Sequence, residues 1–116
     1  MDSIDRNFCI PRRARLVGEW DRSHVMQAHQ VEEHIKRISG WTVKGDQLFR
    51  TFEFDDFAEA FHFMTKVAKI AEELDHHPDW ANSWNKVEIT VTNHQAGGIT
   101  EIDFVLCERI DKQVTR

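Results

Sequence analysis

Apolar residues recur at steps of three and four in three stretches of the chain, the pattern typical of amphipathic helices. The first stretch predicts a helix that is capped by Ser23 and ends at Gly40. The second predicts a helix over residues 57–74. The third opens with Thr100 and Asp103, which form a capping-box pattern, and predicts a last helix. The apolar positions of this last helix are Ile102, Val105, Leu106 and Ile110.

Strands are predicted where apolar and polar residues alternate. Residues 41–43 and 48–54 flank a Gly-Asp turn at 44–47, which predicts a hairpin. Residues 84–92 alternate cleanly and predict a further strand, whereas residues 80–83 are predicted as a loop. The order is helix, strand, strand, helix, strand, helix. We therefore expect an α+β fold, an antiparallel sheet with helices packed on one face.

The helix over residues 57–74 carries more apolar surface than one core requires. Asp56 and Glu59 mark its amino end, where the helix dipole favours acidic side chains. Two adjacent stripes span about half its circumference, so we expect one to pack on the sheet and the other, with Phe63 and Val67, to contact a partner subunit. Cover by the N-terminal segment is the alternative. The stripes are Phe57, Phe61, Met64, Ala68 and Ala71, and Ala60, Phe63, Val67, Ile70 and Leu74.

Length and composition fit one soluble globular domain, with 116 residues, 41% apolar and 30% charged. We expect residues 1–24 to be an N-terminal extension, partly ordered, and residues 25–116 to be the domain. The net charge of -5 disfavours direct nucleic-acid binding, which requires a basic face. No apolar run approaches the roughly 18 residues of a membrane span.

The two cysteines, Cys9 and Cys107, lie far apart and lack the spacing of a disulfide framework or a zinc site. They predict reduced thiols in a reducing compartment. The N-terminal residues show no apolar core of a secretory signal, and acidic residues count against a transit peptide. We therefore expect a cytoplasmic protein.

Two adjacent histidines, His76 and His77, stand with Pro78 directly after the predicted helix 57–74. The proline disfavours helical conformation before it, so the helix should end just ahead of the pair. His94 follows the next predicted strand and can approach the pair if that strand runs back past the helix end. Imidazole has a reference pKa of about 6.5. Several imidazoles in one cleft therefore suit general acid–base catalysis near neutral pH.

Other side chains could complete such a cleft. Glu72 and Asp103 are carboxylates that could orient an imidazole or hold its tautomer. Tryptophans could supply flat apolar walls for an aromatic ring, although they also suit the edge of a core. These tryptophans are Trp41, Trp80 and Trp84.

The three histidines could also bind a metal ion or be structural. Three histidines can hold zinc with an open position, but adjacent histidines in a turn fit such a site poorly, so we expect no metal. Any one of the three alone could be structural. A nucleophilic cysteine is not expected, since Cys107 lies within the last predicted helix. The remaining histidines are predicted to lie on the surface of helices, namely His24, His29, His34 and His62.

The spacing of these residues resembles the signature of the pterin-4a-carbinolamine dehydratases. The resemblance covers about residues 26–111, through four predicted elements, and leaves out residues 1–25. Ala96 stands where some members carry a cysteine. The resemblance rests on Glu72, His76-His77-Pro78, Trp84, His94 and Asp103. These are flanked by Ser39-Gly40-Trp41, Phe52-Glu53-Phe54, Phe61-His62-Phe63-Met64 and residues 92–100.

This resemblance implies dehydration of 4a-hydroxytetrahydropterin to quinonoid dihydropterin, which recycles the pterin of aromatic amino acid hydroxylases. It implies that His76 and His94 form the acid–base pair and that His77 mainly binds and orients the pterin. No cofactor is implied. The supporting or substrate-binding residues would be Glu72, Asp75, Pro78, Trp80, Trp41 and Asp103.

The resemblance also implies partners. Family members are similar in fold, and many form dimers or tetramers through the central helix, here residues 57–74. Some animal members bind a transcription factor and stabilise its dimer through that helix. The alternative to an enzyme is therefore a protein-interaction module of this kind.

Overall fold

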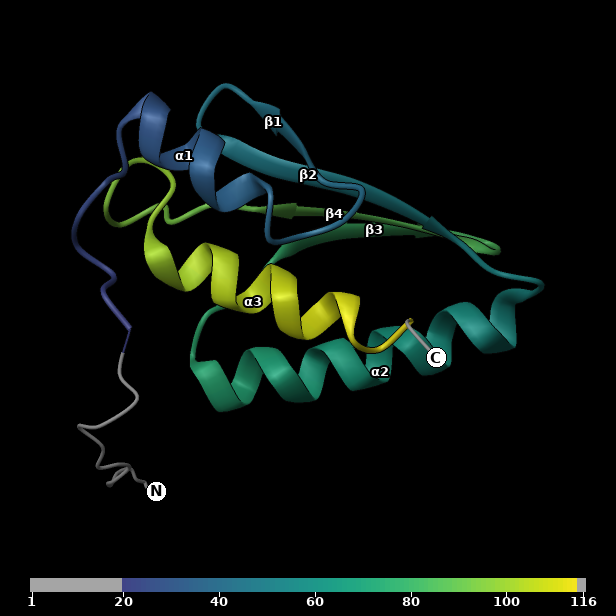
Figure 1. Cartoon of the computed structure of the whole chain (residues 1–116). Helices are drawn as coiled ribbons and strands as arrows, with labels where there is room; N and C mark the ends of the chain where they lie inside the picture. Colours follow the sequence, from purple (N-terminus) through teal and green to yellow (C-terminus); the bar gives the residue numbers. More distant parts are fainter. Residues whose placement is uncertain (1–19, 115–116) are drawn as a thin grey trace, which may run out of the picture.

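Four strands form one antiparallel sheet in the order β1-β2-β4-β3, and α2 and α3 lie side by side on one of its faces (Figure 1). The computed structural model describes residues 20–114. The predicted α+β class, with helices against one face of an antiparallel sheet, is confirmed. The elements are α1 (Ala28–Ile35), β1 (Thr42–Lys44), β2 (Gln47–Glu53), α2 (Phe57–Leu74), β3 (Asp79–Ser83), β4 (Lys86–Val91) and α3 (Glu101–Asp111).

The sequence prediction missed one strand. Residues 80–83 belong to β3, which pairs with β4 from Asp79↔Thr90 to Ser83↔Lys86, and the strand predicted at 84–92 is β4 alone. All five residues of β3 are exposed, because it is an edge strand, so it shows no apolar alternation. Pairing with β4, not the intrinsic preference of its residues, makes this segment a strand.

The first helix is shorter than predicted. It begins at Ala28 after Gln27, whose backbone N–H donates to Gln30 Oε1 at 2.8 Å. Ser23 does not cap it, because residues 24–27 lie outside the helix and Met26 N donates to Ile99 O at 2.8 Å. Met26 therefore packs against the core from a non-helical segment while Val25 stays exposed, which the helical spacing did not reveal.

The second helix has the predicted bounds. Asp56 caps it by accepting from Glu59 N at 2.9 Å. At its other end Asp75 adopts the left-handed conformation, with φ 51°, and the amides of Asp75 and His76 donate back to the last turn. This is the Schellman arrangement, with aspartate where glycine is usual, and it turns the chain sharply out of the helix.

The two apolar stripes of α2 have the opposite roles to those expected. Phe63 and Val67 are buried in the core, so their selection as partner-contact positions was wrong. The exposed stripe includes Phe57 and Phe61, which are 48% and 56% exposed and stack with ring centroids 5.8 Å apart. Adjacent stripes have the same spacing, so periodicity alone does not decide which one faces the sheet.

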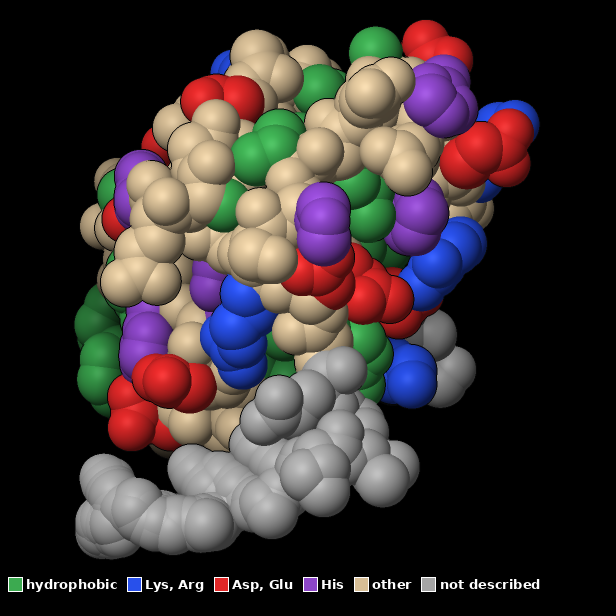
Figure 2. Space-filling view, turned by 90° about the vertical axis from the view of Figure 1, so that its left-hand side faces the viewer, with side chains coloured by type: hydrophobic (Ala, Val, Ile, Leu, Met, Phe, Trp, Pro, Cys, Tyr) green, Lys and Arg blue, Asp and Glu red, His purple; other side chains and the backbone are tan. Residues whose placement is uncertain are grey.

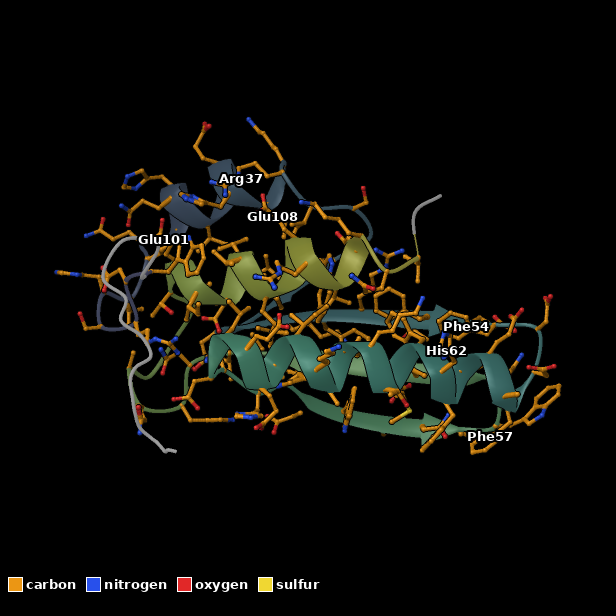
Figure 3. All side chains as sticks on the ribbon, turned by 90° about the horizontal axis from the view of Figure 1, so that it is seen from below. Arg37, Phe54, Phe57, His62, Glu101 and Glu108 are labelled. Carbon is orange, nitrogen blue, oxygen red and sulfur yellow. The ribbon has the colours of Figure 1, made fainter. Side chains whose placement is uncertain are left out.

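The last helix is buried on most sides. It lies between α1 and α2 (Figure 3), with His34 against Phe104 on one side and Arg109 paired to Glu73 on the other. The predicted capping box is present, and Thr100 N donates to Asp103 Oδ2 at 2.7 Å. Its buried residues are Ile102, Asp103, Phe104, Val105, Leu106, Cys107 and Ile110.

Within residues 20–114, no helix is both long enough and apolar enough to cross a membrane. The predicted extension, residues 1–24, falls largely outside this range, as does Cys9. The division of the chain at residue 24 stays a prediction.

Candidate active site

The histidines of the sequence motif lie at one end of the molecule. His76 and His77 follow α2, and His94 follows β4. Because β4 runs antiparallel to β3, its last residues return to the first residue of β3, Asp79, which lies two residues beyond His77. Figure 2 views this end, where histidine side chains lie against acidic side chains on the surface. The strand before His94 therefore runs back toward the end of α2, the direction that brings His94 toward His76 and His77.

His76 is bound to a buried carboxylate. Its Nε2 lies 2.5 Å from Asp103 Oδ1, and the side chains are 12% and 0% exposed. The other oxygen of Asp103 accepts from Thr100 N at 2.7 Å, so the cap of α3 fixes the carboxylate that holds the imidazole. A charge-assisted hydrogen bond in a desolvated place is stronger than one in water. His76 is therefore the most firmly held of the three imidazoles.

The other two histidines are also paired with carboxylates, but in the open. His77 Nε2 lies 2.7 Å from Glu72 Oε2, and His94 Nε2 lies 3.0 Å from Asp79 Oδ2. The imidazoles are 55% and 71% exposed. Pairs this exposed are screened by solvent and hold their partners weakly. His77 and His94 are therefore accessible to a ligand and free to adjust to it.

The three pairs share one chemical arrangement. A carboxylate at Nε2 accepts the N–H of that nitrogen, so in the neutral ring Nδ1 carries the lone pair and can accept a proton. The same carboxylate can accept this N–H when the ring is neutral and when it carries a second proton. One such group can therefore act as a base and a second as an acid without a change in structure.

The aromatic residues expected in the cleft are separated. Trp80 is 37% exposed on β3, and its cross-strand partner Ile89 places it on the face of the sheet that carries the helices. Trp41 is buried, and its Nε1 donates to Asp111 Oδ1 at 2.8 Å, at the far end of α3. Trp84 lies in the β3–β4 turn, beyond the other end of β3. Of the three tryptophans, Trp80 lies at the end of β3 that carries the histidines, since it directly follows Asp79, the partner of His94.

Two residues of this end were not singled out from the sequence. Asp79 escaped notice as the partner of His94 because β3 was not predicted. Asn93 is buried, its Oδ1 accepts from Ala96 N at 3.0 Å, and its Nδ2 donates to Arg22 O at 2.8 Å. An asparagine before a glycine-containing turn often forms hydrogen bonds with the backbone in this way. Asn93 ahead of Gly97 and Gly98 is such a pattern, so the sequence held a signal for this role.

His62 lies away from this site. It lines a cavity of about 490 Å³ together with Phe54. Figure 3 shows His62, Phe54 and Phe57 at one end of the molecule and Glu101, in the first turn of α3, at the other. His62 is exposed on α2, as predicted.

Cys107 is a free thiol buried within α3. Burial and the nearby charge of Asp103 raise the pKa of this thiol well above its ordinary value of 9.0. A cysteine needs a thiolate to act as a nucleophile, so Cys107 serves as a core residue.

Comparison with known proteins identifies the class. Residues 24–113 match the family model for pterin 4 alpha carbinolamine dehydratase. A protein of Rhizobium meliloti, named as a candidate pterin-4-alpha-carbinolamine dehydratase, is 43% identical over 93 residues, or 78% of this chain and 89% of that protein. The chain therefore belongs to the pterin-4a-carbinolamine dehydratase family.

Further relatives agree. A protein of Prochlorococcus marinus, named in the same way, is 42% identical over 90 residues, or 78% of this chain and 95% of the relative. The crystal structure of a transcriptional coactivator/pterin dehydratase from Brucella melitensis has a TM-score of 0.76 and 34% identity, and the match covers 79% of this chain and all of that one. A pterin dehydratase-like RuBisCO assembly factor of the alpha-carboxysome matches at a TM-score of 0.53 and 21% identity, over 81% of this chain and 94% of that one, and shares the fold alone.

Proposed function

We propose that this protein removes water from 4a-hydroxytetrahydropterin to give quinonoid dihydropterin, and so recycles the pterin cofactor of aromatic amino acid hydroxylases. Membership of the family supports pterin carbinolamine dehydratase activity. The observation that carries the proposal is the buried pair of His76 with Asp103, at the same end of the molecule as the accessible His94. We propose a cytoplasmic location, because Cys107 is buried without a disulfide partner among the described residues.

The elimination needs two proton transfers. The C4a–O bond breaks, the leaving hydroxyl takes a proton from an acid and departs as water, and a ring nitrogen loses its proton to a base. His76 and His94 are proposed as this pair, each with its carboxylate, and His77 as the group that binds and orients the pterin. Such transfers are each worth about 10²- to 10⁴-fold in rate. The chemistry requires neither a metal nor a covalent intermediate.

Supporting roles follow from the contacts. Asp103 and Glu72 orient His76 and His77, and Asp75 directs the chain out of α2 in its left-handed conformation. Pro78 follows the histidine pair, and Trp80 is proposed to line the pterin site. Trp41 is proposed to support the fold at the other end of α3.

A direct assay tests the proposal. Carbinolamine generated by a pterin-dependent hydroxylase should lose water faster when this protein is added, in proportion to its concentration. The absorbance of quinonoid dihydropterin reports the product. No acceleration over the spontaneous reaction would contradict the proposed function.

Removal of metal ions should leave the activity intact. Extensive dialysis against EDTA is expected to change the dehydratase rate by less than about 2-fold, because proton transfer between imidazoles and the pterin uses no Lewis acid. The measurement is the same assay before dialysis, after dialysis, and after addition of zinc. A loss of activity that zinc restores would favour a metal centre instead.

We also propose that the protein forms a dimer or tetramer through the exposed stripe of α2, which includes Phe57 and Phe61. Phe61→Glu is expected to lower the mass measured by light scattering, because a charge cannot be desolvated in an apolar interface. The matched control is Lys66→Glu, about 140° round the helix from Phe61. An unchanged mass for Phe61→Glu would contradict the interface.

A protein-interaction module is the second candidate. The Brucella melitensis structure is described as a transcriptional coactivator as well as a pterin dehydratase, and the exposed rings of Phe57 and Phe61 offer an apolar surface for another protein. The assay separates the two candidates, since a module without catalysis would show no turnover. The net charge of -5 favours a protein partner over direct contact with nucleic acid.

A further inference from the structure

Residues 21–26, here called the strap, run before α1 across the end of the molecule that carries the histidines. Asp21 N donates to Glu101 Oε1 at 3.1 Å, in the first turn of α3. At the other end of the strap, Met26 N donates to Ile99 O at 2.8 Å. The strap is therefore anchored at both ends to the segment that leads into α3, the helix that supplies Asp103.

The strap has a defined local shape. The Asp21 carboxylate accepts from Ser23 N at 2.8 Å and from Ser23 Oγ at 3.0 Å, and His24 Nδ1 lies 2.6 Å away. The backbone N–H of Ser23 and the imidazole of His24 lower the pKa of Asp21 from 3.8 to about 2. The carboxylate therefore stays ionised at neutral pH, and the turn it closes presents Arg22 to the end of α2.

Arg22 binds the main chain directly before the histidine pair. Its Nη1 donates to Asp75 O at 2.9 Å, and its Nη2 donates to Leu74 O. The last carbonyls of a helix lack partners within the helix, and a cation is favoured there by the helix dipole. Asp75 holds the left-handed conformation that sets the direction in which His76 leaves α2. The guanidinium therefore holds the residue from which the histidine pair extends.

The backbone of Arg22 contacts the other histidine turn. Its carbonyl oxygen accepts from Asn93 Nδ2 at 2.8 Å. Asn93 is buried, precedes His94, and closes the following turn through Ala96 N. A single residue is thus hydrogen-bonded to the neighbours of both His76 and His94, which are 18 positions apart in the chain.

We infer that Arg22 is a positioning residue that sets the spacing between the imidazoles of His76 and His94 through the main chain of residues 74–75 and the side chain of Asn93. This inference rests on the proposed function for its kinetic readout. Arg22 lies outside the apolar core, so its removal should change the geometry of the site more than the stability of the fold. Misplacement of a reacting group by about 1 Å can cost about 10²-fold in rate.

The test compares Arg22→Met and Arg22→Lys with the wild-type chain. Arg22→Met removes both donors, and we expect kcat to fall by about 10-fold with a smaller change in KM. Arg22→Lys keeps the charge but cannot form the two-pronged contact, and we expect an intermediate kcat. The ring ¹H–¹⁵N correlations of His76 and His94 should shift in Arg22→Met.

The matched control is Arg37→Met, which removes an exposed guanidinium paired with Glu108 at 3.2 Å, between the end of α1 and α3. We expect its kcat and histidine spectra to equal those of the wild type.

Wild-type kcat and unshifted ring signals in a folded Arg22→Met would overturn the inference. If that variant does not fold, the same result in Arg22→Lys would do so. A wild-type chain without turnover would overturn the proposed function, while the ring spectra would still test Arg22.

Discussion

Replacement of His76 or His94 by alanine is expected to lower the dehydratase turnover by about 10²-fold or more, the usual contribution of a general acid or base. His76 should show the larger effect on stability as well, because its partner Asp103 is fully buried and would lose its hydrogen bond. His94 and its partner Asp79 are exposed, so His94→Ala should fold as stably as the wild type. The measurement is kcat, together with urea denaturation of each variant.

The control for both variants is His62→Ala. His62 is an exposed histidine of α2 at the opposite end of the molecule, so its loss should leave turnover unchanged (Figure 3). Near-normal turnover of His76→Ala or His94→Ala would remove that residue from the mechanism. Equal losses in all three variants would show that the assay reports general damage to the protein.

Substitution Asp103→Asn is expected to damage both the fold and the catalytic site. Asp103 accepts at Oδ1 from His76 and at Oδ2 from Thr100 N, whereas asparagine has only one acceptor atom. If the amide oxygen keeps the cap of α3, its NH₂ group faces His76 Nε2 and favours the tautomer with the lone pair on that nitrogen. We expect turnover to fall by about 10²-fold and the free energy of unfolding to fall by about 1–2 kcal/mol.

Glu108→Gln is the matched control for Asp103→Asn. It neutralises a carboxylate of the same helix, whose pair with Arg37 is partly exposed at 3.2 Å, so stability should change by less than about 0.5 kcal/mol. Turnover should not change. If Asp103→Asn lost stability but kept full turnover, the carboxylate would be a capping group only.

The sequence was most informative where local chemistry decides the structure. The bounds of α2 followed from the cap at Asp56 and the proline after the histidines, and the cap of α3 followed from Thr100 and Asp103. The strand β3 and the start of α1 were missed, because pairing with β4 and contact with Ile99 determine them. Pairing with a neighbouring strand, like contact with a distant residue, leaves no periodic signal in the segment itself.

In the candidate site, too, local sequence predicts some features and tertiary contacts determine the others. His76, His77 and His94, with Glu72 and Asp103, could be selected from residue type and spacing. Which carboxylate pairs with which histidine could not be predicted, since Glu72 precedes His76 by one turn yet binds His77. The role of Trp41 also depends on tertiary packing, which places it against Phe52, with ring centroids 6.0 Å apart. A tryptophan beside a glycine in the sequence does not reveal which end of the sheet it will reach.

The central position of α3 has a consequence for biosynthesis. This helix is the last of the described elements in chain order, yet it lies between α1 and α2 and buries most of its side chains. A nascent chain that still lacks residues 101–111 would leave the inner faces of α1, α2 and the sheet exposed to water, and His76 without Asp103. We expect the core to form only once residues 101–111 are available to it, so that catalytic competence and completion of the core arise together.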